Sequence, residues 1–234
     1  MAKSLRVPFY VTDFSKLSEV SVLAARLKGL GQIDVLANNA GGIMGNREVT
    51  EDGFEKTFQV NHLAPFLLTR LLLPDLITSR AKVIQTASAA ANMWGADFDV
   101  TDLNNERDYA PEHAYGCAKL ENILFTRELQ RRFGGSDISA VAFHPGVVRS
   151  AFASDTTHFM KSIYHSPLKY LFTISSEKSA KRLVRLVEGR PGADWKTGEV
   201  YDDRKPMPVK FQDDGSVAKS LWDKSEDMVR KWVK

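Results

Sequence analysis

Short apolar runs that alternate with helical patterns limit this sequence to few folds. Each run is apolar at consecutive positions, as in "IDVLAN" (33–38), which is typical of a strand covered on both faces. The segments between the runs place apolar residues three or four positions apart, which is the spacing of one helix face. The pattern predicts an α/β fold with a parallel sheet covered by helices on both sides. We expect strands at 5–11, 33–38, 82–88, 139–146 and 198–203, and helices that include 16–29, 112–133 and 176–188.

The composition indicates one soluble domain over residues 1–234 and excludes several classes of protein. Hydrophobic residues make up 43% and charged residues 26% of the chain, which is ordinary for a globular domain. The net charge is +3 without a dense basic block, so we expect no nucleic-acid partner. No run reaches the roughly 18 apolar residues of a membrane span, so we expect no stable membrane insertion. The single cysteine, Cys117, excludes an internal disulfide and favours a cytoplasmic location.

Unusual polar and small residues follow the predicted strands. They are Asp13 after the first strand, Asn38-Asn39-Ala40-Gly41 after the second, Ser88 after the third and Pro145-Gly146 after the fourth. Ligands of open parallel sheets bind outside the carboxyl ends of the strands. The sequence therefore predicts one crevice that collects these residues.

Tyr115 and Lys119 are four residues apart near the start of the predicted helix 112–133, so they share a helix face. A free tyrosine has a pKa of about 10, which is too high for a base at neutral pH. An ammonium about 4 Å away is worth roughly 4 kcal/mol at an effective dielectric constant of about 20, or about three pKa units. The pair is a candidate catalytic acid–base; the alternative is a half-buried tyrosine beside a solvated lysine.

Five blocks in order identify a family. They are "NNAG" (38–41), "QVNHLAPFLLT" (59–69), "VIQTAS" (83–88), "AYGCAKLENILFTREL" (114–129) and "HPGVVRS" (144–150). The sequence resembles the short-chain dehydrogenase/reductase family, and within it the branch of the retinol dehydrogenases and the WW-domain oxidoreductase. The resemblance implies a Rossmann-like, doubly wound parallel sheet and hydride transfer between NADP (or NAD) and a small lipophilic carbonyl or alcohol substrate. It also allows a homodimer.

The resemblance assigns four catalytic positions. It implies that Tyr115 exchanges a proton with the substrate oxygen, that Lys119 tunes Tyr115, and that Ser88 stabilises charge on that oxygen. It implies that Asn61 holds a water that links Lys119 to solvent. The alternatives are a strand-end serine that bonds local backbone and an asparagine that bends its helix.

The resemblance also assigns the cofactor-binding positions. Asp13 and the backbone of Phe14 match positions that hold the adenine. Asn39, Ala40 and Gly41 match positions that line the adenosine ribose, where small residues allow close approach. The remaining positions contact the nicotinamide end, and they are Tyr115, Lys119, Val148 and Ser150.

One part of the family pattern is missing from the printed sequence. The family opens with a strand, a turn resembling T-G-x-x-x-G-x-G, a helix and a second strand, whereas the glycines ahead of Asn38 are Gly29 and Gly31. We therefore expect an N-terminally truncated sheet that lacks the first βαβ unit, in which 5–11 pairs directly with 33–38. Two hypotheses stay open: a nicotinamide-dependent oxidoreductase, and a cofactor-poor binding protein or pseudoenzyme.

The segment 152–174 is rich in aromatic and aliphatic residues and poor in acids. It is interpreted as a lid over a lipophilic substrate, with a helix pair packed on the core as the alternative.

Overall fold

The computed structural model describes residues 7–146, 174–213 and 215–233. Its sheet has the strand order β1-β2-β3-β4-β5, which follows the order of the strands along the chain. The first four strands are parallel and β5 runs antiparallel to β4. The strands are β1 (Val35–Asn38), β2 (Lys82–Thr86), β3 (Ser139–His144), β4 (Val200–Asp202) and β5 (Lys205–Pro206).

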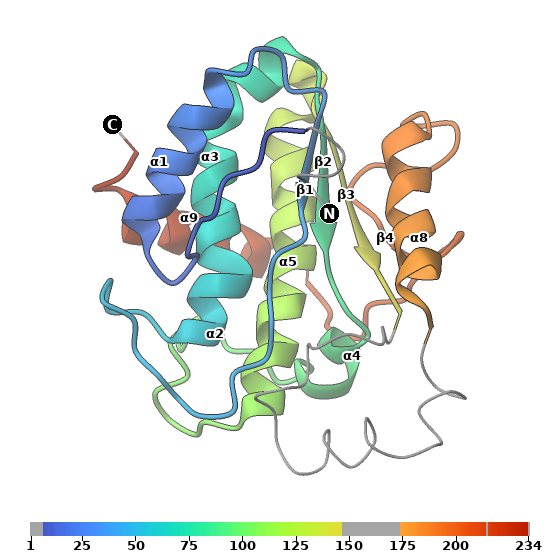
Figure 1. The fold of residues 1–234 in the computed structure, drawn as a ribbon. Coiled ribbons are helices and arrows are strands. Elements are labelled where there is room, and N and C mark those ends of the chain that lie inside the picture. The colour runs from blue at the N-terminus through green and yellow to red at the C-terminus, as the bar shows by residue number, and fades with distance from the viewer. Residues whose placement is uncertain (1–6, 147–173, 214, 234) are drawn as a thin grey trace.

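Helices cover both faces of this sheet (Figure 1). Helix α8 lies on one face, and α1, α3, α5 and α9 lie on the other, with α1 beside α3 and α9 across α3 and α5. This arrangement confirms the predicted α/β fold with a parallel sheet between helix layers. The long helices are α1 (Leu17–Lys28), α3 (Ala64–Thr78), α5 (Pro111–Phe133), α8 (Ser176–Glu188) and α9 (Ser216–Val229). The short ones are α2 (Lys56–Phe58), the π-helical turn η1 (Gln59–Leu63), α4 (Ala90–Trp94) and the 3₁₀ turn η2 (Gly134–Ser136).

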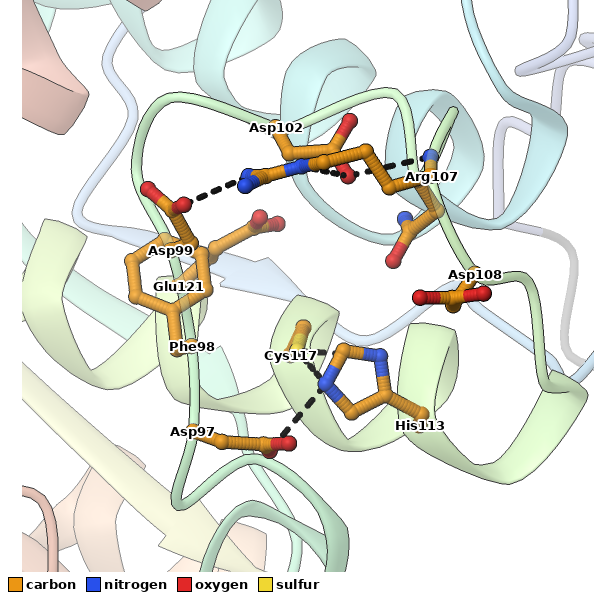
Figure 2. A pocket seen from close by; sticks show the side chains of 10 residues that line it. Asp97, Phe98, Asp99, Asp102, Arg107, Asp108, His113, Cys117 and Glu121 are labelled. Carbon is orange, nitrogen blue, oxygen red and sulfur yellow. Dashed lines mark hydrogen bonds and ion pairs between the residues drawn. The ribbon is translucent and has the colours of Figure 1, made fainter.

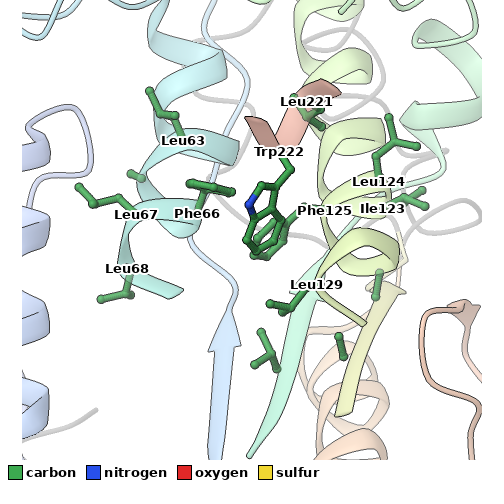
Figure 3. Close-up of a cluster of buried hydrophobic side chains, with 14 of the residues drawn as sticks. Leu63, Phe66, Leu67, Leu68, Ile123, Leu124, Phe125, Leu129, Leu221 and Trp222 are labelled. Carbon is green, nitrogen blue, oxygen red and sulfur yellow. The ribbon is translucent and has the colours of Figure 1, made fainter. Parts of the chain in front are cut away.

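An aromatic cluster holds α3, α5 and α9 together (Figure 3). The ring of Trp222 stacks on Phe125 with centroids 5.6 Å apart and meets Phe66 edge-on at 5.0 Å. All three side chains are buried. Burying a large aromatic side chain contributes about 1.5–3 kcal/mol, so this cluster fixes α5, the helix that carries Tyr115 and Lys119, against its neighbours.

Two helix starts near the site follow from local sequence. Pro111 occupies the first turn of α5, where its missing N–H costs nothing. The carboxylate of Glu55 accepts hydrogen bonds from the backbone N–H groups of Thr57 (2.7 Å) and Phe58 (2.8 Å) at the start of α2. The site therefore rests on helix starts that the sequence itself specifies.

The predicted strand at 5–11 is wrong over residues 7–11, and residues 5 and 6 lie outside the described part of the chain. Val11 is 89% exposed, so the apolar run is not buried between layers. The segment attaches to the helix side instead: Arg26 lies over the Tyr10 ring at 5.4 Å, and Phe14 packs on the core. Pro8 supplies no backbone N–H for a sheet ladder.

Direct pairing of 5–11 with β1 is wrong for the same residues. Among the described residues β1 pairs with β2 alone, and its other edge faces no strand. The side chain of Ala37, in the middle of β1, is exposed.

Across the described ranges, no helix combines the length and the apolar character needed to cross a membrane.

Candidate functional site

The carboxyl end of β1 brings the backbone of Gly41 against two predicted site residues. A Cβ atom placed on Gly41 would lie 2.4 Å from Asn61 Oδ1 and 3.1 Å from Lys119 Nζ. Any side chain at this position would therefore displace one of the two groups. The close approach explains why the chain has glycine here, and it joins the predicted catalytic and ribose-binding positions in one site.

Asn61 holds the loop that contains Gly41. Its Nδ2 donates hydrogen bonds to the carbonyl oxygens of Gly42 (2.7 Å) and Thr57 (2.8 Å), and its Oδ1 accepts one from Gly42 N–H (3.1 Å). Asn61 lies within η1, and π-helical turns of this kind occur frequently at functional sites. The bond from Nδ2 to the carbonyl oxygen of Thr57, four residues earlier, is the local contact that the helix-bending alternative expects. Neither that alternative nor the water-holding role is tested, and both remain predictions.

Lys119 is a buried cation with unused hydrogen-bonding capacity. Its ammonium, 2% exposed as a residue, donates to the carbonyl oxygen of Thr86 at 3.2 Å. An ammonium has three donors, and no described carboxylate forms an ion pair with it. Burial lowers the pKa of Lys119 to about 8. Among the residues that the structure describes, the two remaining donors have no hydrogen-bond partner, and a ligand could accept from them.

Tyr115 and Ser88 both contact Ala90. The ring of Tyr115, 8% exposed, packs with Ala90 and Ile43, and Lys119 Nζ lies 5.4 Å from the ring centroid. Ser88 Oγ accepts a hydrogen bond from the N–H of Ala90 at 3.1 Å. This is the local bond that the alternative interpretation of Ser88 expected, and it leaves the hydroxyl proton to donate elsewhere.

Two of the predicted ribose-binding residues are exposed next to this cluster. Asn39 and Ala40 follow β1 on the surface, and Asn39 Oδ1 accepts a hydrogen bond from Thr86 Oγ1 at 2.9 Å. The buried Asn38 points inward and donates from Nδ2 to Thr69 Oγ1 at 2.9 Å, so it ties β1 to α3.

The two predicted adenine-binding residues lie ahead of α1. The carboxylate of Asp13 accepts hydrogen bonds from Ser15 Oγ (2.7 Å) and Ser15 N–H (2.9 Å), which hold its pKa below the usual value. The carbonyl oxygen of Phe14 accepts a hydrogen bond from Gln59 Nε2 at 3.2 Å, which links this segment to η1. Both Val148 and Ser150 lie outside the described residues.

Sequence reasoning missed two residues that complete the cluster. Asn122 Nδ2 donates to the same Thr86 carbonyl oxygen that Lys119 binds, also at 3.2 Å. His144 Nδ1 accepts from Ala89 N–H at 3.3 Å, beside Ser88. The spacing of Asn122, one helical turn after Lys119, is the signal that would have predicted it.

Comparisons with known proteins agree with this geometry. The sequence profile described as "short chain dehydrogenase" matches residues 1–161. The chain is 40% identical to the Streptomyces sp. (strain C5) protein DnrU, provisionally named a daunorubicin C-13 ketoreductase, over 91% of this chain and 71% of DnrU. It is 39% identical to human retinol dehydrogenase 14 over 85% of this chain, and it spans 59% of that relative.

A solved structure shares the fold. The NADPH-bound carbonyl reductase from chicken fatty liver superposes with a TM-score of 0.62 and 22% identity, over 88% of this chain and 79% of that chain. Together with the parallel sheet, this places the chain in the Rossmann-like class. The profile and the relatives go further: the chain belongs to the short chain dehydrogenase family, a class of oxidoreductases that use a nicotinamide cofactor.

The burial of Lys119 predicts a pH dependence of stability. Its pKa is about 8 in the folded state and 10.5 when unperturbed, so between these pH values the unfolded chain binds the proton and the folded chain does not. The free energy of unfolding gained from Lys119 therefore rises with pH across this window, by roughly 3 kcal/mol in total.

Urea unfolding of the native chain and of Lys119→Met at a series of pH values measures this gain. We expect the native chain to gain stability relative to Lys119→Met from pH 8 to pH 10.5. Lys178→Met, at an exposed position, should differ from the native chain in stability by the same amount at every pH. Parallel curves for the native chain and Lys119→Met would contradict a depressed pKa.

Proposed function

We propose that this chain transfers a hydride between a nicotinamide cofactor and a lipophilic carbonyl or alcohol. Tyr115 is the group that exchanges the proton with the substrate oxygen, and Lys119 supplies the positive charge that favours its ionised form. Ser88 donates a hydrogen bond to the same oxygen. Asn61 holds the loop that positions Gly41.

The observation that carries this proposal is the buried ammonium of Lys119 beside the Tyr115 ring. A buried cation without a carboxylate partner is costly, and Lys119 has one hydrogen bond among the described residues. Hydroxyl groups of a ligand bound next to this ammonium would accept hydrogen bonds from it and offset this free-energy cost. The small, exposed Ala40 leaves room for such a ligand at the end of β1.

The cofactor fits these donors. When bound, it supplies the hydride; Lys119 would hold its nicotinamide ribose hydroxyls, and Asn39, Ala40 and Gly41 would line its adenosine ribose. Asp13 and Phe14 would lie at the adenine, and Val148 and Ser150 at the carboxamide. We propose NADP as the cofactor, with NAD as the alternative, and a comparison of rates with NADPH and NADH decides between them.

The lipophilic substrate is supported by the names of the relatives. By name, one relative acts on retinol, and the other, provisionally named, reduces daunorubicin at C-13. Burying one additional methylene contributes about 0.8 kcal/mol, or about fourfold in kcat/KM. The reduction of straight-chain aldehydes from propanal to octanal, at millimolar NADPH or NADH, tests the proposal.

We expect kcat/KM to rise by about fourfold per methylene until the substrate fills its site. We expect kcat/KM for octanal to be well above that for propanal. In the reverse reaction, oxidation of the matching alcohols should follow the same order. Equal values along the series would contradict a lipophilic site while leaving the oxidoreductase intact. No reduction of any aldehyde at millimolar cofactor would contradict the proposed reaction.

A further inference from the structure

A pocket lies on the opposite side of α5 from Tyr115 and Lys119. It is formed by one face of α5 and the loop ahead of it, and its volume is about 280 Å³ (Figure 2). Helix α5 contributes His113, Cys117 and Glu121, which are one turn apart and share that face. None of these three is among the residues assigned to hydride transfer.

The lining of this pocket carries an excess of negative charge. Its acidic residues outnumber its one arginine, Arg107, which is already held by Asp99 (2.5 Å) and Asp102 (3.1 Å). His113 Nε2 lies 3.1 Å from Asp97 Oδ1 at one side. The acidic residues are Asp97, Asp99, Asp102, Asp108 and Glu121.

Glu121 is the group that points to a ligand. It is 2% exposed, its Oε2 is buried without a hydrogen-bond partner among the described residues, and its carboxyl group points into the middle of the pocket. Burial, and then the carboxylate of Glu55, raise the pKa of Glu121 well above its usual value. A buried carboxyl group with an unused oxygen costs free energy unless it gains a partner.

We propose that this pocket binds a small organic cation with an ammonium or guanidinium head, which donates to Glu121 Oε2 at the floor and to Asp108 at the mouth. Asp108 is exposed and forms no ion pair among the residues that the structure describes. The volume suits a head group with a short apolar stem, which would contact Phe98. No described cluster has three or more residues placed to hold a metal ion.

Cys117 is the sole cysteine of the chain and lines the pocket, so its labelling reports on this pocket alone. The labelling is slow, because the thiol is buried and burial raises its pKa. Methanethiosulfonates react with a thiolate to form a mixed disulfide and release methanesulfinate. We compare the aminoethyl reagent, which is cationic, with the sulfonatoethyl reagent, which is anionic, each relative to its rate with N-acetylcysteine. An acidic pocket is expected to favour the cation at least about tenfold.

Two variants test the carboxyl groups. We expect Asp108→Asn at the exposed mouth to lower the cation preference severalfold. Glu121→Gln, which keeps the shape of the side chain but cannot ionise beside a bound cation, should lower it as well. Glu188→Gln, an exposed residue of α8 with the same change in net charge, should leave it unchanged. An equal preference in the native chain and both pocket variants would overturn the proposal.

Protection completes the test. Propylammonium or methylguanidinium at tens of millimolar should slow labelling of Cys117 by the neutral methyl methanethiosulfonate, and this protection should weaken in Glu121→Gln. Propanol, which has the same stem without the charge, should not protect. Equal protection by propanol, or none by either cation, would show that the pocket does not recognise a positive charge. None of these measurements depends on the oxidoreductase activity.

Discussion

Tyr115→Phe is expected to lower kcat to the background of the assay, a loss of about 10²–10⁴-fold or more, while the chain keeps its fold. The change removes one hydroxyl group, and proton transfer by a positioned side chain contributes a factor of this size. The ring of Tyr115 is 8% exposed and packs with Ile43 and Ala90, and phenylalanine preserves those contacts. Aldehyde reduction under saturating cofactor measures the loss.

The matched control is Tyr201→Phe. Tyr201 is 5% exposed, lies on β4, and accepts a hydrogen bond from Lys196 N–H at 2.8 Å. Its loss should cost about 1 kcal/mol of stability and leave kcat unchanged. Thermal unfolding of both variants separates the two effects. A Tyr115→Phe variant that retains most of its rate across several aldehydes would rule out Tyr115 as the proton donor.

The sequence was sufficient for the elements whose signals are local. The spacing of Tyr115 and Lys119 predicts a shared helix face, and both residues lie on α5. The parallel strands of the sheet are apolar on both faces, so their runs stood out without any knowledge of their neighbours. The type and order of the expected elements from 16–29 onward were therefore predictable.

The strand predicted at 5–11 failed because an apolar run does not reveal what lies beside it. Whether Phe9 and Val11 form a strand depends on a neighbouring ladder, and a sequence window does not contain that ladder. Here the adjoining Tyr10 and Phe14 contact the helix layer instead.

The contacts that define the Lys119 site and the Glu121 pocket were also outside the reach of local patterns. The approach of Gly41 to Asn61 and Lys119 joins three segments that are distant in the chain. Glu121 occupies a position in α5 where the sequence predicts only a charged helix residue, and its burial arises from the loop that folds over it. Tertiary packing determines both the approach of Gly41 to these residues and the burial of Glu121.

We also expect a large effect on the affinity of the chain for its cofactor. In the family, backbone N–H groups of a Gly-rich turn and the start of the following helix hold the pyrophosphate. The glycines ahead of β1 serve other purposes: Gly29 ends α1, and Gly31 has a positive φ of 95° in the turn that leads to β1. The carboxylate of Asp13 already accepts hydrogen bonds from the backbone N–H and the hydroxyl group of Ser15. None of these residues offers the described chain a pyrophosphate clamp.

Hydrogen bonds to a charged group are worth about 1.5–3 kcal/mol each, so the loss of two or three costs roughly 4–6 kcal/mol. This corresponds to about a thousandfold or more in affinity and shifts a micromolar site to the millimolar range. We therefore expect the 234-residue polypeptide to bind NADPH with a millimolar Kd. Calorimetric titration measures it, with Lys119→Met as the control that loses the remaining ribose contact.

Adding a Gly-rich turn ahead of the 234-residue polypeptide should raise its affinity for the cofactor. A chimera in which the residues of human retinol dehydrogenase 13 that precede its match to this chain are fused ahead of residue 7 supplies a preceding segment from a 37% identical relative. That segment would also pair with the open edge of β1, where no described strand lies. We expect the chimera to bind NADPH about a thousandfold more tightly than the 234-residue chain. Low-micromolar binding by the 234-residue chain alone, at one site per chain, would show that another of its segments holds the pyrophosphate.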